Sequence, residues 1–208
     1  MLLVWNEVQM RKFLVILSFV VATITTTAPA RAHPHVYIDA RAVLHMKAGK
    51  VVAITQQWTF DAIFSGVVIK TFDKNEDKSF TGAELSALRA GAFNNLKNFN
   101  YFTVVRLGKK ELKIEKVTRF AATVKDQRLT YSFTLQLPRP LNPKDRKLAF
   151  LFLDRTYYVA VELAKKRPVA LTGAAPKGCK PVVREDTDNP IYYGSVVPLM
   201  VRFSCATS

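Results

Sequence analysis

The sequence predicts an α+β protein, mainly an antiparallel β-sandwich with one inserted helix-loop-helix. Stretches in both halves of the chain alternate apolar and polar residues, as half-buried strands do. Only two segments show helical spacing, and they flank one acidic loop. No strand-helix-strand alternation follows, which argues against a parallel sheet covered by helices.

The first predicted strands form a hairpin. Residues 36–46 alternate, residues 47–50 read as a turn, and residues 51–60 return with the same period. Alternation resumes from residue 101 to residue 137, and a Pro/Lys-rich loop at 138–147 follows. Because Leu148–Leu153 is apolar at every position, we expect a strand buried on both faces, with residues 156–163 as its partner.

The predicted helical insertion covers about residues 60–99. Apolar side chains recur at three-to-four spacing over residues 60–72 and again over residues 85–99. Residues 169–208 predict two or three short strands. The loop at 138–147 is too short for a convincing linker, so residues 33–208 are expected to form a single domain.

The N-terminus is typical of a secretory signal peptide over residues 1–32. Arg11 and Lys12 precede the apolar run Phe13–Val21, and Ala30-Arg31-Ala32 forms a small-residue cleavage site. This run is shorter than the roughly 20 apolar residues that a membrane-spanning helix needs. We therefore expect cleavage after Ala32 and a periplasmic location for residues 33–208.

Charge and cysteines fit that compartment. The 208 residues carry a formal net charge of +15. Export makes nucleic acid an unsuitable partner for this charge, whereas anionic membrane surfaces or acidic proteins are accessible. Cys179 and Cys205 are expected to form a disulfide, as paired cysteines do in oxidising compartments.

The acidic loop, residues 73–84, has the spacing of an EF-hand calcium loop. Oxygen-bearing side chains or a backbone carbonyl occupy positions one, three, five, seven, nine and twelve, namely Asp73, Asn75, Asp77, Ser79, Thr81 and Glu84. Lys78 departs from the pattern, because it stands where the sharp turn prefers glycine. The alternative is a helix-loop-helix scaffold that keeps these carboxylates without binding calcium.

His33 and His35 form a second candidate site. After cleavage, the free α-amine and the His33 imidazole would chelate a transition metal, with His35 as a further ligand. Nitrogen donors suit nickel, zinc, cobalt or copper, but Pro34 has no amide proton for the square-planar copper geometry. His45 lies about 33 Å along the same strand and is too distant to join this site. An exposed histidine pair without a role is the alternative.

The sequence does not predict an enzyme. It contains no Gly-x-Ser-x-Gly nucleophile motif, no glycine-rich phosphate loop and no recognisable acid-base pair. Asp154 and its aromatic neighbours up to Tyr158 read as a turn followed by packing side chains. A secreted metalloenzyme would need more ligands than three histidines supply.

Several motifs together resemble the secreted bacterial family known as domain of unknown function one thousand and seven. They are His33-Pro34-His35-Val36-Tyr37-Ile38-Asp39, Trp58-Thr59-Phe60-Asp61, the acidic loop with Phe80-Thr81 and Glu84, Tyr101-Phe102-Thr103, and Asp154-Arg155-Thr156-Tyr157-Tyr158-Val159. The resemblance implies a periplasmic component of an uncharacterised transport system, with an inner-membrane permease of the nickel/cobalt type. Lys78 departs from the glycine usual in the family's loop.

Two functions follow as expectations. The first is a periplasmic accessory protein that passes a divalent transition metal from His33 and His35 to a permease, with the calcium loop as structural support. The second is a calcium-stabilised interaction module of the envelope without a transition-metal function.

Overall fold

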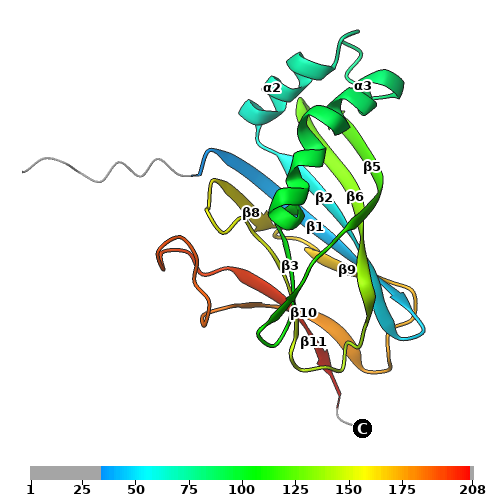
Figure 1. Cartoon of the computed structure of the whole chain (residues 1–208), viewed down its shortest axis with the longest axis vertical. Helices are drawn as coiled ribbons and strands as arrows, with labels where there is room; N and C mark the ends of the chain where they lie inside the picture. The colour runs from blue at the N-terminus through cyan, green and yellow to red at the C-terminus, as the bar shows by residue number, and fades with distance from the viewer. Residues whose placement is uncertain (1–33, 207–208) are drawn as a thin grey trace, which may run out of the picture. The chain divides into compact units, whose positions relative to one another are not determined.

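The computed structural model describes residues 34–206, which form two β-sheets and a short helical region (Figure 1). The predicted α+β class is confirmed, because strands predominate and the helices are few. The predicted signal peptide, residues 1–32, and His33 lie outside the described residues. Within residues 34–206, no helix combines the length and the apolar character needed to cross a membrane.

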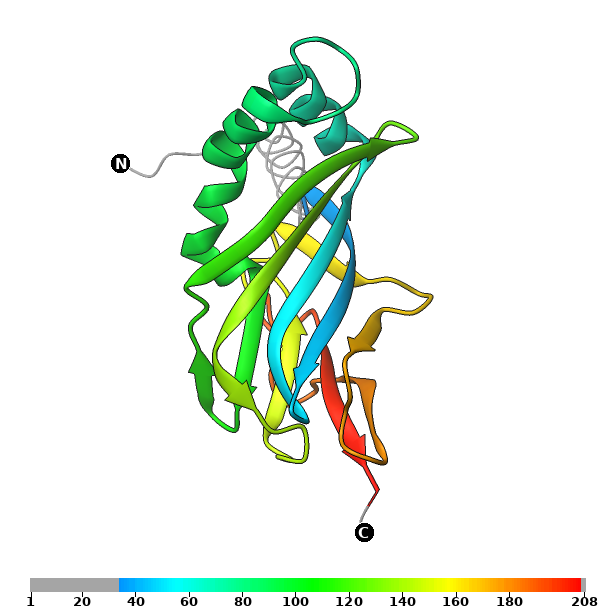
Figure 2. The ribbon, with the colours of Figure 1, turned by 90° about the vertical axis from the view of Figure 1, so that its right-hand side faces the viewer.

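The first sheet contains six strands in the order β5-β6-β2-β1-β8, with β9 also paired to β1. Their bounds are β1 (Val36–Lys47), β2 (Lys50–Phe60), β5 (Lys116–Lys125), β6 (Arg128–Leu141), β8 (Val159–Leu163) and β9 (Val169–Thr172). The predicted hairpin is confirmed, with Ile38 opposite Phe60 and Lys47 opposite Lys50. Figure 2 shows β5, β6, β2 and β1 side by side.

The second sheet contains five strands in the order β10-β11-β7-β3-β4. Their bounds are β3 (Thr103–Leu107), β4 (Lys110–Leu112), β7 (Leu148–Phe152), β10 (Cys179–Glu185) and β11 (Leu199–Cys205). Every residue of β7 is buried, which confirms the strand predicted from its unbroken apolar run.

The predicted partner of β7 is wrong. Residues 156–163 were expected beside it, but β8 leaves the second sheet and pairs with β1 of the first, in parallel. The turn before β8 explains the change of sheet. Asp154 accepts hydrogen bonds from the backbone N–H groups of Thr156 (2.9 Å) and Val159 (3.1 Å), which redirects the chain. The β9 strand is also parallel to β1, so the first sheet is mixed.

The helical region consists of α2 (Ala62–Phe72), α3 (Gly82–Leu88), the π-helix η1 (Arg89–Phe93) and the 3-10 helix η2 (Asn94–Phe102). The second predicted helix, residues 85–99, therefore begins earlier and does not stay α-helical. Leu88 and Phe93 are both fully buried, five residues apart, and the wider π turn places both on the core side.

Both sheets contribute to one hydrophobic cluster. Trp58 and Phe133 of the first sheet belong to the same cluster as Val105 and Phe150 of the second, and all four are fully buried. The Trp58 ring also stacks on Phe102 at the end of η2, with centroids 5.7 Å apart. This contact fixes the helical region to the core. The acidic loop connects α2 and α3 within that region.

Candidate cation site

Helix α2 is anchored at its start by Asp61, its N-cap residue. Asp61 Oδ1 accepts a hydrogen bond from the Phe64 N–H at 2.9 Å, and Oδ2 accepts one from the Tyr37 N–H of β1 at 2.9 Å. Burial acts to raise the pKa of Asp61, but backbone hydrogen bonds outweigh it and the pKa is lowered. The anchored helix ends at Asp73, its C-cap residue and the first residue of the acidic loop.

The loop is held against the first sheet by its middle residues. Phe80 is buried in the core cluster, and Ser79 forms an isolated β-bridge with Thr123 of β5. Glu76 and Lys78 both have left-handed backbone angles, with φ of 60° and 61°. Lys78, which stands where the sharp turn prefers glycine, therefore adopts a left-handed conformation that its side chain makes costly.

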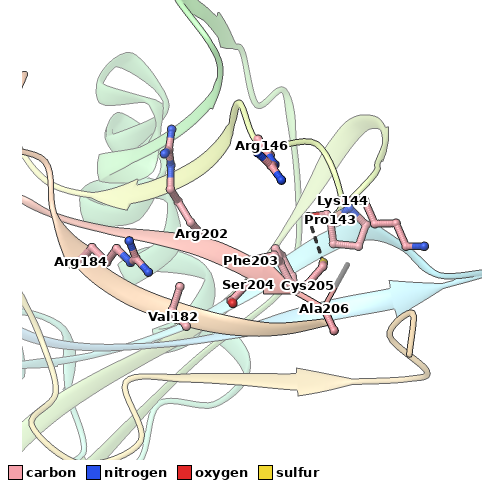
Figure 3. Close-up of a pocket in the computed structure, with 10 residues that line it drawn as sticks. All are labelled: Pro143, Lys144, Arg146, Val182, Arg184, Arg202, Phe203, Ser204, Cys205 and Ala206. Carbon is pink, nitrogen blue, oxygen red and sulfur yellow. Dashed lines mark hydrogen bonds between the residues drawn. The ribbon is translucent and has the colours of Figure 1, made fainter. Parts of the chain in front are cut away.

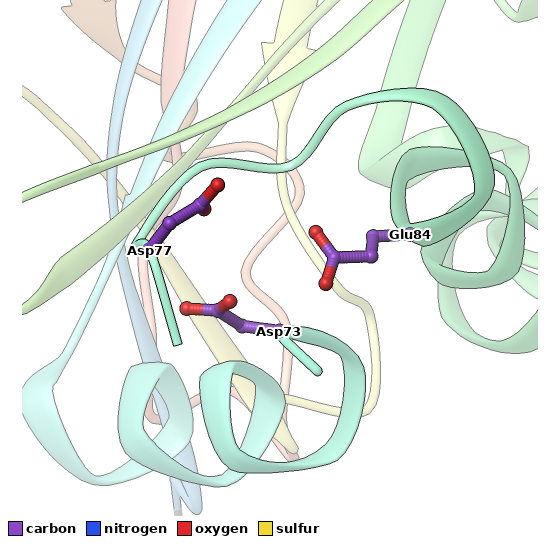
Figure 4. Close-up of side chains that lie close together, drawn as sticks. All are labelled: Asp73, Asp77 and Glu84. Atoms are coloured by element: carbon purple, nitrogen blue, oxygen red, sulfur yellow. The ribbon is translucent and has the colours of Figure 1, made fainter. Parts of the chain in front are cut away.

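Three carboxylates converge inside the loop (Figure 4). One oxygen atom from each of Asp73, Asp77 and Glu84 lies within 4.8 Å of the others. Asp73 is only 5% exposed, whereas Glu84 is half-buried and Asp77 is exposed. The cluster is therefore buried at Asp73 and accessible to solvent at Asp77.

Backbone N–H groups hold these carboxylates in place. Asp73 Oδ2 accepts from Lys78 at 2.9 Å, and Asp77 Oδ1 accepts from Ser79 at 2.7 Å. Glu84 Oε1, from the first turn of α3, accepts from Lys74 at 2.7 Å and from Asn75 at 3.2 Å. These bonds draw the last residue of the loop back over its first residues.

One buried oxygen of the cluster has no hydrogen-bond partner among the described residues. Asp73 Oδ1 is buried and accepts no hydrogen bond from any described residue. An orphaned buried carboxylate oxygen carries a free-energy cost of about 1–3 kcal/mol or more. A cation between the three carboxylates would remove that cost and the mutual repulsion of the negative charges.

The donor set suits a hard cation. Carboxylate, amide and carbonyl oxygens are the ligands that Ca²⁺ takes, and the buried, unpartnered Asp73 oxygen is available to such an ion. Nitrogen or sulfur donors, which softer metals prefer, are missing from the group of three.

The other predicted loop residues occupy the rim. Asn75 donates through Nδ2 to Asp77 Oδ2 at 2.9 Å and accepts from the Asp77 N–H at 3.1 Å, so its amide lies beside the cluster. Ser79 contributes its backbone to the loop and to the bridge with Thr123. Thr81 is the N-cap residue of α3 and makes no side-chain capping bond.

Of the two histidines that the structure describes, His35 lies just before β1 and His45 lies on it. The His35 N–H donates to the Tyr158 carbonyl oxygen at 2.9 Å, and its ring packs against the Tyr158 ring with centroids 4.7 Å apart. His33, its predicted co-ligand, lies outside the described residues. His45 Nε2 lies 2.7 Å from Thr55 Oγ1, and burial, with a smaller effect of Arg119, lowers the pKa of His45.

The predicted disulfide between Cys179 and Cys205 is confirmed, with an S–S distance of 2.01 Å. The two cysteines are directly opposite each other at the ends of β10 and β11. The disulfide therefore closes the open end of this hairpin.

Sequence reasoning missed two residues that position the loop. They are Phe80, which the loop buries in the core, and Thr123 of β5, which bridges to the loop. An apolar residue inside an otherwise polar loop is a signal for an anchor, and it would have identified Phe80. Thr123 carries no local signal, because its contact with Ser79 joins segments distant in the sequence.

Fold and site together define an α+β protein with a candidate oxygen-ligand cation site beside its first sheet. The chain belongs to the family described as "Protein of unknown function (DUF1007)", which matches residues 18–195. It is 34% identical over 131 residues to the "Uncharacterized 15.5 kDa protein in trpE 3'region" of Spirochaeta aurantia, an alignment that covers 63% of this chain and 93% of that protein. It is 27% identical over 152 residues to an "Uncharacterized protein" of Haemophilus influenzae, covering 72% of this chain and 71% of the relative.

Proposed function

We propose that this protein is a calcium-binding module of the bacterial periplasm, with the ion held by the loop 73–84. The observation that carries the proposal is the buried Asp73 Oδ1, which has no hydrogen-bond partner among the described residues and belongs to a cluster with Asp77 and Glu84. Asn75 and backbone carbonyls of the loop would complete the oxygen shell. The ion has a structural role and supports an interaction surface; we propose no catalysis.

We propose that the two sheets form a sandwich and that α2, the loop and α3 form an EF-hand-like unit. The shared core cluster and the bond between the Lys78 N–H and Asp73 support this assignment. The periplasmic location rests on the signal-peptide pattern of residues 1–32, with the disulfide as support.

Thermal unfolding with and without calcium tests this function. A ligand that binds only the folded state stabilises it by about 2.7 kcal/mol at a hundredfold excess over its Kd. Calcium should therefore raise the Tm of the wild type, and EGTA should reverse the rise. The Asp73→Asn variant should lose the response, whereas Asp188→Asn, which removes an exposed carboxylate elsewhere, should keep it. A wild-type Tm that is the same with and without calcium contradicts the proposal.

A second proposed function uses the histidines. We propose that His33 and His35, with the amine exposed after cleavage at Ala32, pass nickel, zinc, cobalt or copper to an inner-membrane permease. The favouring observation is that the His35 backbone and ring are both fixed by Tyr158, which gives a preorganised imidazole next to the predicted terminus.

Metal titration of protein with its native N-terminus tests this second function. His35→Ala should weaken nickel and zinc binding, and His45→Ala should not, because the His45 ring on β1 is engaged with Thr55 of β2. Equal affinity in the wild type and His35→Ala contradicts it. The readout is separate from the calcium response, so either function can fail alone.

A further inference from the structure

A basic groove is lined by residues between 143 and 206, which are distant in sequence from the acidic loop at 73–84. It has a volume of about 600 Å³ and lies between the loop that precedes β7 and the strands β10 and β11. Its lining contains four cations and no carboxylate, and these cations are Lys144, Arg146, Arg184 and Arg202. The groove also has an apolar part, to which Val182 and Phe203 contribute.

Strand register places two of the arginines on one face. Arg202 of β11 is directly opposite Val182 of β10, and Arg184 lies two residues further along β10. Arg184 and Arg202 are therefore diagonal neighbours on the same side of the hairpin, about 7–8 Å apart in a regular antiparallel pair. Figure 3 shows their guanidinium groups on one side of these strands, with Arg146 facing them from the loop, whereas Lys144 points away.

Among residues 34–206, the groove cations have no ion-pair partner. Within residues 34–206, ion pairs join Arg41 to Asp39, Arg106 to Asp186 and Arg155 to Glu111, and none involves a groove residue. The contrast with Arg106 is informative, because Arg106 also belongs to the second sheet and its charge is matched by the buried Asp186 at 2.8 Å. The charge of Arg106 is thus paired within the protein, whereas the described residues supply no ion pair for the groove cations.

Arg202 is also partly desolvated. Its Nε atom is buried and has no hydrogen-bond acceptor among the described residues. A buried guanidinium N–H without an acceptor is costly, and the cost is relieved when an anion binds. Guanidinium groups bind phosphate oxygens through paired, parallel hydrogen bonds, and a phosphate accepts such pairs from several directions, whereas a carboxylate has only two oxygens.

We propose that Arg146, Arg184 and Arg202 form a binding site for a phosphate group. The arginines supply the charge and the paired donors, and the apolar part of the groove accommodates the organic portion of a phosphate ester. The same chemistry is offered by free phosphate and by the headgroup of an anionic phospholipid. The site uses none of the residues proposed to bind calcium or transition metals.

The test measures binding of two probes to protein with its native N-terminus at low ionic strength, where screening is weak. Inorganic phosphate is titrated by calorimetry, and vesicles of phosphatidylglycerol are compared with vesicles of phosphatidylcholine by co-sedimentation. Binding of inorganic phosphate identifies a site that free phosphate fills. Binding only to phosphatidylglycerol vesicles identifies a headgroup site. Absence of binding in both arms overturns the proposal.

Variants establish that the groove is responsible. Arg184→Ala and Arg202→Ala should each weaken binding about tenfold or more, since each removes charged hydrogen bonds. Arg89→Ala removes the same charge from the exposed start of η1 and should leave binding unchanged. Arg202→Lys keeps the charge and loses the paired donors, so it should also weaken binding. Equal losses in all variants, or full binding in Arg202→Lys, would reduce the effect to net charge and contradict the proposal. Unchanged Tm values show that the variants remain folded.

Discussion

The Lys78 N–H donates to Asp73 Oδ2 at 2.9 Å, and the second oxygen of the same carboxylate, Oδ1, is buried without a partner among residues 34–206. The loop therefore uses one Asp73 oxygen to hold its own turn and leaves the other without a hydrogen-bond partner, in a carboxylate that converges with those of Asp77 and Glu84. Under the proposed function, this division lets a carboxylate that is 5% exposed hold the turn with one oxygen and bind the cation with the other.

Replacing Lys78 separates its charge from its backbone strain. Lys78→Gly and Lys78→Gln both remove the charge, but only glycine adopts φ of 61° without steric cost. In saturating calcium, we expect Lys78→Gly to have a free energy of unfolding higher than that of Lys78→Gln by up to about 1 kcal/mol, because strain relief outweighs the added freedom of the unfolded chain. Urea denaturation measures this difference. An equal or lower stability of the glycine variant would show that the turn carries no strain.

Removing the Asp61 side chain should loosen the support of the loop. Asp61→Ala loses the helix cap at Phe64 and the bond to Tyr37, and we expect a cost of about 1–2 kcal/mol in the free energy of unfolding at neutral pH. Asp188→Ala, which removes an exposed carboxylate, is the matched control and should cost far less.

The cost of Asp61→Ala should depend on pH. The pKa of Asp61 is lowered in the folded state from its ordinary value of 3.8, so the folded protein favours the carboxylate. This contribution is complete well above pH 3.8 and is lost as the pH falls through the lowered folded-state pKa. The stability curves of wild type and Asp61→Ala should therefore converge in acid. Parallel curves over the whole range would contradict the role of the ionised carboxylate.

The disulfide should contribute strongly to the stability of β10 and β11. Cys179 and Cys205 are separated by 26 residues, and the chain-entropy relation gives about 3.5 kcal/mol for a loop of this length. The Cys179→Ala/Cys205→Ala double variant should therefore unfold at a lower urea concentration than the wild type. A loss below about 1 kcal/mol would show that the open hairpin is held by its other contacts.

The strands and the acidic loop could be predicted from the spacing of apolar and oxygen-bearing residues in the sequence. Alternation of apolar and polar residues identified the hairpin of β1 and β2, because it indicates a strand buried on one face. The unbroken apolar run identified β7, because it indicates a strand buried on both faces. Oxygen-bearing side chains at fixed spacing identified Asp73, Asp77 and Glu84, which the fold brings together.

Features that depend on distant segments were not predictable in this way. Nothing in Val159–Leu163 indicates that it pairs with β1 rather than β7, because the sequence of a short strand does not determine which strand it pairs with. Asn100, Tyr101 and Phe102 have left-handed φ values without any glycine, and tertiary bonds hold them, including that from the Ile114 N–H to Asn100 Oδ1 at 3.0 Å. The groove arginines converge only when β10, β11 and the loop before β7 are assembled.

Calorimetric titration of calcium into metal-free protein tests the central claim most directly. We predict one calcium ion per wild-type chain, and an affinity about tenfold or more weaker in both Asp73→Asn and Glu84→Gln, since each neutralises one of three converging carboxylates. Asp188→Asn should bind as the wild type does. A wild-type protein that takes up no calcium, or an Asp73→Asn variant that binds it with undiminished affinity, would contradict the account.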